Sequence, residues 1–141
     1  GDLMQLRFSA VCEDAQPRTD GRLDVHGIFH SLPAPGFPAL QDHMVLVIVI
    51  EWDREDYGRY RFQVTLDHET APFSERVLDV ETEVRKPTAF EAGAKTPVIV
   101  PMHEVLFPHP GQYTFRIKAK GNTIDGPGVY LVEVPEAQTD T

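Results

Sequence analysis

The sequence predicts an all-β fold, an antiparallel β-sandwich of about eight strands with immunoglobulin-like architecture. Three observations support this prediction. Apolar and polar residues alternate with a period of two in several segments. Twelve prolines and ten glycines in 141 residues interrupt the chain too often for a few long helices. We identify neither an amphipathic helix nor an internal repeat, and a closed barrel is the alternative architecture.

The length and composition indicate one soluble globular domain. We expect a single domain over residues 1–134 and a flexible C-terminal tail over 135–141, where the sequence becomes polar. Apolar residues make up 41% and charged residues 25% of the chain. The longest apolar run, residues 44–50, is too short to cross a bilayer, which takes about 20 residues.

The N-terminal part predicts two strands and a loop. Alternation predicts a strand over residues 4–13, with one core-facing side that is expected to carry Met4, Leu6, Phe8, Ala10 and Cys12. A turn region follows at 17–21, and the same alternation then predicts a second strand over 23–29. Residues 31–38 contain three prolines and a glycine, so we expect a loop there.

The strand expected over residues 43–52 is the most hydrophobic element of the chain. Residues 44–50 are all apolar and mostly β-branched, which favours a strand that is buried on both faces. Its position is therefore expected to be central or covered. If one of its faces is not covered within the molecule, that face would form a dimer interface.

The remaining strands follow at intervals. The cleanest alternation in the chain, at 58–67, directs Tyr60, Phe62, Val64 and Leu66 inward. Pro101 indicates that one later strand lies at a sheet edge or is broken. Tyr113 stands where an immunoglobulin-like corner places a tyrosine that bonds back to the backbone. A second loop region is expected at 86–97, and the later strands at 76–84, 98–107, 112–120 and 129–134, the last of them after a break at 126–128.

Charge and cysteine content limit the partners and the compartment. The formal net charge of −9 repels nucleic-acid phosphates and anionic lipids, so we expect neither a nucleic-acid nor a membrane partner. The single cysteine, Cys12, cannot form an intramolecular disulfide. This favours a cytoplasmic location.

Several short motifs resemble a family of short, mostly bacterial proteins of unknown function. The motifs are Cys12-Glu13-Asp14, Gly21-Arg22-Leu23, Gly27-Ile28-Phe29, Phe37-Pro38 and the later Pro110-Gly111-Gln112-Tyr113-Thr114-Phe115. The middle of the chain has no counterpart in this pattern. The resemblance implies a small β-sandwich and carries over no activity, ligand, cofactor or catalytic residue.

Two candidate ligand sites share the hairpin at residues 51–60. Glu51, Asp53, Glu55 and Asp56 form the densest acidic group, and clustered oxygen ligands of this kind suit calcium. Their spacing lacks the EF-hand pattern, and a solvated hairpin tip explains the charges equally well. Three aromatic residues of the same hairpin could stack on a sugar, as an alternative to capping the core. They are Trp52, Tyr57 and Tyr60.

The sequence offers no catalytic motif. The six histidines lack metal-ligand spacing, since His26 and His30 on one strand would lie about 13 Å apart. The three serines stand outside any nucleophile motif, and Cys12 is expected to pack in the core. We therefore expect a protein that is not an enzyme and needs no cofactor.

The sequence leaves three functional hypotheses. The first is a non-enzymatic interaction or structural module that acts through a protein partner, for instance at an open sheet edge, or through self-association as a homo-oligomer. The second is a module that binds calcium or carbohydrate through the 51–60 hairpin. The third, a hydrolase, would require Cys12 or a serine to meet a distant histidine beside a cleft.

Overall fold

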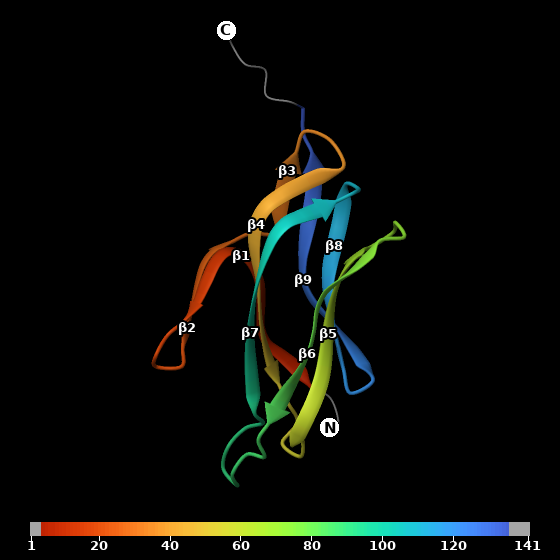
Figure 1. Ribbon diagram of the computed structural model, residues 1–141. Coiled ribbons are helices and arrows are strands. Elements are labelled where there is room, and N and C mark those ends of the chain that lie inside the picture. Colours follow the sequence, from red (N-terminus) through yellow and green to blue (C-terminus); the bar gives the residue numbers. More distant parts are fainter. Residues whose placement is uncertain (1–3, 136–141) are drawn as a thin grey trace.

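Nine strands in two sheets form the fold in the computed structural model, which describes residues 4–135 (Figure 1). No helix occurs within these residues. Sheet A contains, in spatial order, β2 (Leu23–Ile28), β1 (Gln5–Pro17), β4 (Ala39–Glu51) and β7 (Lys95–Phe107). Sheet B contains β3 (Ser31–Ala34), β9 (Asn122–Glu133), β8 (Gly111–Ala119), β5 (Gly58–His68) and β6 (Ser74–Val84). The expected C-terminal tail lies, apart from Pro135, outside the described residues.

The two sheets share one hydrophobic core, and three strands supply most of it. The side chains that face this core alternate along each of these strands, as a pleated strand requires. They are Met44, Leu46, Ile48 and Ile50 of β4, Phe62, Val64 and Leu66 of β5, and Tyr113, Phe115 and Ile117 of β8. The inward alternation predicted for 58–67 is thus confirmed, and β4 is a central strand as predicted. Each such side chain contributes about 1.5–3 kcal/mol by its burial.

The face predicted for the first strand is wrong beyond Leu6. The register of β1 against β4 shifts between Leu6 and Phe8, so Arg7 is an extra, bulged residue. A one-residue shift moves every later side chain to the opposite face of the sheet. Val11 therefore enters the main core, whereas Cys12 lies on the outer side of sheet A.

One segment predicted to be a loop contains a strand. Ser31–Ala34, expected to be loop, forms the short edge strand β3, which pairs in parallel with β9. Sheet B is consequently mixed rather than antiparallel, and the strand count is nine rather than eight. Pro33 is tolerated because an edge strand needs partners on one side only.

The last strand is longer than predicted. β9 begins at Asn122 and continues through the expected break at 126–128. The register of β8 against β9 shifts between Thr114 and Arg116, next to this segment. A Cβ on Gly126 would lie 2.9 Å from the Phe115 carbonyl oxygen, so glycine permits the strands to approach closely here.

Two further predictions are confirmed. The strand that contains Pro101 lies at the edge of sheet A, although β7 starts at Lys95, inside the region expected to be loop. The Tyr113 hydroxyl donates to the His109 carbonyl oxygen at 2.7 Å and accepts from the His109 N–H at 2.9 Å.

Among residues 4–135, no helix is present that could span a membrane.

Candidate functional site

The acidic residues of the 51–60 hairpin interact with different partners in the structure. Glu51, at the end of β4, accepts a hydrogen bond from the Gln5 side chain at 2.7 Å. Its carboxylate also lies 3.5 Å from Arg7 and 3.6 Å from Lys95. Glu51 is thus neutralised by strands of sheet A and belongs to the surface of that sheet.

Asp56 has a different partner. It is only 7% exposed, and both of its carboxylate oxygens accept hydrogen bonds of 2.8 Å from Lys120 Nζ. Asp56 Oδ2 also accepts from the Asp53 N–H at 3.0 Å. Lys120 belongs to the β8–β9 turn, so this ion pair fastens that turn to the β4–β5 turn.

Asp53 and Glu55 shape the β4–β5 turn itself. The Glu55 N–H donates to Asp53 Oδ1 at 2.9 Å, and this hydrogen bond lowers the pKa of Asp53 below its ordinary value. Within residues 4–135, no group of three or more histidine, cysteine, aspartate or glutamate side chains is placed to hold a metal ion. The four carboxylates are therefore not brought together as a calcium site would require.

The three hairpin aromatics do not form one binding surface. Trp52 is 2% exposed, and its indole N–H donates to Thr96 Oγ1 at 2.8 Å. The Tyr60 ring stacks on it with the ring centroids 5.0 Å apart, whereas Tyr57 is 65% exposed and has Lys86 Nζ 5.8 Å from its ring centroid. The expectation that Trp52 stacks on a ligand is not supported, because its ring caps the core.

Cys12 does not have the environment of a nucleophile. It is fully buried, its Sγ donates to the Val45 carbonyl oxygen at 3.5 Å, and burial raises the pKa of the thiol. Low-pKa, accessible thiols are the reactive ones. Cys12 is therefore a packing residue, as the sequence predicts.

Four of the histidines form two pairs that the sequence did not predict. His43 and His103 are directly opposite on β4 and β7, with ring centroids 5.0 Å apart. The rings of His68 and His109 lie 5.7 Å apart. His68 Nδ1 accepts from the backbone N–H groups of residues 70 and 71, and Nε2 lies 2.8 Å from the Pro110 carbonyl oxygen. Since both of its ring nitrogens have partners, His68 is a structural residue.

The outer side of sheet A carries an apolar face that the sequence analysis missed. It consists of three residues from each of β1, β4 and β7, at directly paired positions, and all nine are apolar. Its rows are Phe8–Val49–Pro97, Ala10–Val47–Ile99 and Cys12–Val45–Pro101, which we call the apolar face. The run of apolar residues at 44–50 was the one available signal, because the bulge at Arg7 is not evident from the sequence.

Polar residues border the apolar face at both ends of the strands. The next row toward the β4–β5 turn is Gln5–Glu51–Lys95, with Arg7 beside it. The next pair in the other direction is His43 and His103. An apolar centre with a polar rim is the usual anatomy of a protein–protein interface.

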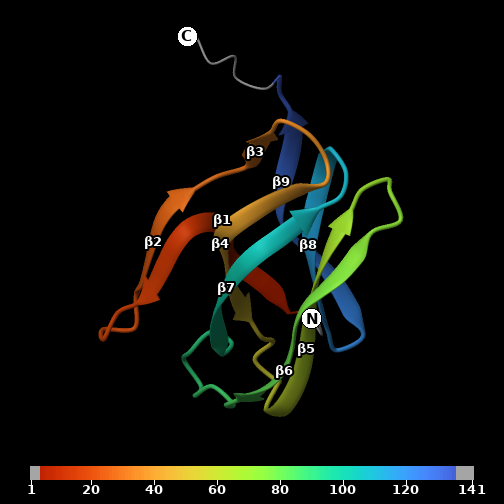
Figure 2. The same ribbon diagram turned by 45° about the horizontal axis from the view of Figure 1, so that its top comes forward.

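The β1–β2 hairpin covers part of the apolar face. Ala15, Leu23 and Val25 of this hairpin pack against the buried cluster of Cys12, Val45 and Val47. Figure 2 shows the hairpin as a ribbon on the side of sheet A away from β7.

The opposite part of the apolar face is open. Phe8 is 39% exposed, Pro97 and Pro101 are exposed, and Val49 and Ile99 are half-buried. A contiguous exposed apolar surface with a polar border marks an interaction site.

The outer side of sheet B is charged, in contrast to the apolar face of sheet A. It carries cross-strand ion pairs, among them Arg61 with Asp79 at 2.6 Å and Arg116 with Asp67 at 3.0 Å. Such a charged face is an ordinary solvated surface. The two outer faces of the molecule therefore differ in polarity.

The ion pairs of sheet B predict a loss of stability in acid. The hydrogen bond from Arg61 holds the pKa of Asp79 far below its ordinary 3.8. Burial alone would raise the pKa of Asp67, but hydrogen bonds from Ser74 and Arg116 outweigh it and lower the pKa. Because each carboxyl group has a lower pKa in the folded state than in the unfolded state, its ionised form stabilises the fold at pH values above the unfolded pKa of 3.8. This contribution to stability is lost as the pH falls below 3.8 toward the folded-state pKa. The free energy of unfolding, measured with urea, should therefore fall from about pH 5 to about pH 2.5.

The variant Asp79→Asn tests the cause of this acid effect. It should be less stable than the parent at neutral pH and should lose less stability on acidification. An equal pH dependence in the two proteins would contradict the assignment to Asp79.

The fold defines a class: an all-β module of two packed sheets, with no group of three or more metal-ligating side chains in the part that the structure describes. A family model gives the identity. The chain belongs to DUF6941, a family of unknown function, whose model matches residues 7–131. The family resemblance seen in the sequence is therefore confirmed. Comparison with curated proteins finds no match.

Solved structures support the fold alone. The chain is similar to part of a β-glucosidase from Listeria innocua in complex with glucose, at 11% identity and a TM-score of 0.50, over 94% of this chain and 16% of that one. It is also similar to part of a β-glucosidase from Erythrobacter marinus, at 12% identity and a TM-score of 0.51, over 92% of this chain and 15% of that one. The chain thus spans less than a fifth of either glucosidase.

Proposed function

We propose that this chain is a non-enzymatic association module that forms a homodimer through the apolar face of sheet A. The observation that carries the proposal is the set of nine directly paired apolar residues on an outer sheet surface, with polar residues at both ends. Solvent-facing positions of an antiparallel sheet are ordinarily polar. Contact with a second apolar face would remove Phe8 and the two exposed prolines from water.

We also infer that the connectivity is immunoglobulin-like. Strands β1, β4 and β7 share one sheet while β5, β8 and β9 share the other, which corresponds to the A, B, E and C, F, G strands of that fold. β6 beside β5 corresponds to the extra strand of variable-type domains. The hydrogen bonds of Tyr113 to His109 correspond to the tyrosine corner.

Charge sets the orientation of the second copy. Arg7 and Lys95 give one end of the apolar face a positive character, despite the nearby Glu51. The other end is the pair His43 and His103, because Asp42 precedes His43 on β4 and therefore points to the opposite side of the sheet. A second copy turned end for end about a twofold axis would keep the two basic ends apart.

The size of the face sets the expected affinity. Three strands about 4.8 Å apart and three rows about 6.6 Å apart give an apolar surface of about 14 by 20 Å, or ~280 Å² per copy, and the two polar border rows extend it to ~450 Å². Stable interfaces bury about 800 Å² per partner, and smaller ones are transient. We therefore expect a dimer with a dissociation constant in the micromolar range.

Substitution of Phe8 tests the proposal. Phe8→Glu places a charge in the exposed part of the apolar face, and we expect sedimentation equilibrium to show at least a tenfold weaker dimer. Tyr57→Glu is the control, because Tyr57 is 65% exposed but lies away from this face. Equal effects of the two substitutions, or none from Phe8→Glu, would overturn the proposal.

A charge swap tests the end-for-end arrangement. His103→Lys should weaken the dimer, because it places a lysine against the basic end of the second copy, and His103→Lys combined with Lys95→Glu should restore part of the affinity. This readout stays available if Phe8→Glu fails to fold. Additive losses in the double variant would contradict the arrangement.

A further inference from the structure

The edge strands of the two sheets differ in how well they are protected against pairing with a further strand. Within residues 4–135, the edge strands are β2 and β7 of sheet A and β3 and β6 of sheet B. β2 and β3 are only six and four residues long. β7 is long, but it contains Pro97 and Pro101, and Glu104 has a positive φ of 53°. Short length, proline and local kinks all hinder the addition of another strand.

β6 lacks these protections. It is 11 residues long and contains neither proline nor glycine. Its register against β5 shifts once, at Val77, and is regular from Leu78 to Val84. These seven residues therefore present a regular row of backbone donors and acceptors on the side away from β5.

Apolar side chains lie along the inner margin of this edge. Val77 and Leu78 are half-buried against the core, and Val80 is 37% exposed. Next to them, a groove of about 310 Å³ opens between β6 and β7, with Leu66 and Met102 among its lining residues. A strand added to β6 would cover these side chains with its own inward-facing residues.

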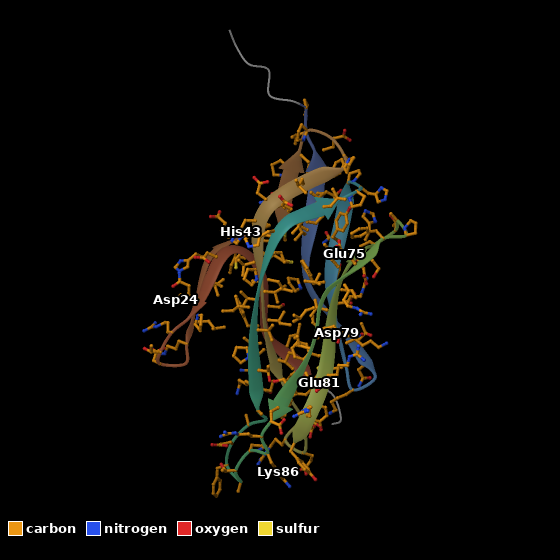
Figure 3. The ribbon with its side chains drawn as sticks, viewed as in Figure 1. Asp24, His43, Glu75, Asp79, Glu81 and Lys86 are labelled. Atoms are coloured by element: carbon orange, nitrogen blue, oxygen red, sulfur yellow. The ribbon has the colours of Figure 1, made fainter. Side chains whose placement is uncertain are left out.

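The outward side chains of the same edge are acidic. Asp79, Glu81 and Glu83 alternate along β6, and Figure 3 shows Glu75, Asp79 and Glu81 along this strand. Glu81 and Glu83 share one guanidinium, since Arg59 Nε lies 3.7 Å and 3.8 Å from them. One arginine leaves this pair with a net negative charge.

This charge pattern determines which kind of strand can pair with β6. An antiparallel pairing of β6 with β6 of a second copy, centred on Glu81, would place acidic residues directly opposite one another, which is destabilising. A partner strand with basic residues at the outward positions would instead form cross-strand ion pairs. The acidic residues thus oppose self-pairing and favour a basic partner.

We propose that the Leu78–Val84 edge of β6 binds an extended segment of a partner protein in which apolar and basic residues alternate. Backbone hydrogen bonds would extend sheet B by one strand, the apolar residues would face Leu78 and Val80, and the basic residues would face Glu81 and Glu83. This edge belongs to the other sheet from the apolar face. A negative result for the homodimer would therefore not contradict the proposal for β6, and the reverse also holds.

A model peptide tests this surface. The probe is the seven-residue peptide Lys-Val-Lys-Val-Lys-Val-Lys with a fluorophore, and binding is measured by fluorescence anisotropy. A peptide of the same composition with all lysines before all valines controls for simple charge attraction to this acidic chain. We expect the scrambled peptide to bind at least tenfold more weakly, because it cannot place valines inward and lysines outward at once.

Charge reversal on the protein locates the site. Glu81→Lys combined with Glu83→Lys should weaken binding of the alternating peptide at least tenfold. Glu55→Lys makes one such change on the β4–β5 turn and should leave binding within twofold. Backbone amides of β6 should exchange hydrogen more slowly when the peptide is bound.

Three results would overturn the proposal. They are an absence of binding by the alternating peptide, equal binding by the scrambled peptide, and slowed amide exchange at β7 or β3 in place of β6.

Discussion

Asp56→Ala is expected to lower the free energy of unfolding by about 3 kcal/mol. The substitution removes a carboxylate that is 7% exposed and deprives the Lys120 ammonium, whose side chain is only 16% exposed, of two charged hydrogen-bond acceptors. Removing one member of a buried ion pair is costly because the remaining charge stays desolvated. It also removes the acceptor of the Asp53 N–H and so loosens the β4–β5 turn. Urea denaturation monitored by Trp52 fluorescence measures the change.

Two controls separate the ion pair from other effects at this site. Glu55→Ala, an exposed substitution in the same turn, should change stability by no more than about 0.5 kcal/mol. The double variant Asp56→Ala/Lys120→Ala should be less destabilised than the sum of its two single variants, because the charges are removed together. A loss below about 1 kcal/mol for Asp56→Ala would contradict this structural role.

Tyr113→Phe is expected to cost about 2 kcal/mol of stability. The Tyr113 hydroxyl both donates to the His109 carbonyl oxygen and accepts from the His109 N–H. The ring is fully buried, and it packs edge-on against Phe107 at 5.0 Å and His68 at 4.8 Å. Phenylalanine keeps that packing but leaves two backbone groups without their partner. The readout is again the free energy of unfolding in urea.

Tyr130→Phe is the matched control, because Tyr130 is 48% exposed on β9. We expect it to be neutral within about 0.5 kcal/mol. Equal losses in the two variants would mean that the Tyr113 hydroxyl does not close the β7–β8 corner.

Much of the fold follows from the sequence because its determinants are local. Alternation at 58–67 reports burial on one face directly, and β5 has that pattern. The apolar run at 44–50 indicated a central or covered strand, and β4 is central because it pairs with β1 on one edge and with β7 on the other. Pro101 indicated an edge, since an edge strand needs hydrogen-bond partners on one side only.

The features that the sequence missed depend on tertiary contacts. Arg7 is an ordinary residue within an alternating segment, and only its pairing with β4 makes it a bulge that reverses the face of Phe8 and Cys12. Ser31–Ala34 is a strand only because β9 lies beside it. Local preference for a loop was overridden there by pairing across the sheet.

The candidate site was predicted least well, for the same reason. The acidic residues of the 51–60 hairpin are neighbours in sequence, but Asp56 pairs with Lys120, 64 residues away, and Glu51 pairs with Arg7 and Lys95. The partner of a charged side chain decides whether that side chain can bind an ion. The apolar face similarly combines residues from three strands that are distant in the sequence.

The most direct test of the account is the solution mass of the unmodified protein, measured by light scattering from about 5 µM to about 500 µM. Self-association through the apolar face predicts the mass of a monomer at the lowest concentrations and a rise toward twice that mass at the highest. A mass that stays monomeric throughout the series, or one that grows beyond the dimer, would contradict a closed twofold contact on sheet A.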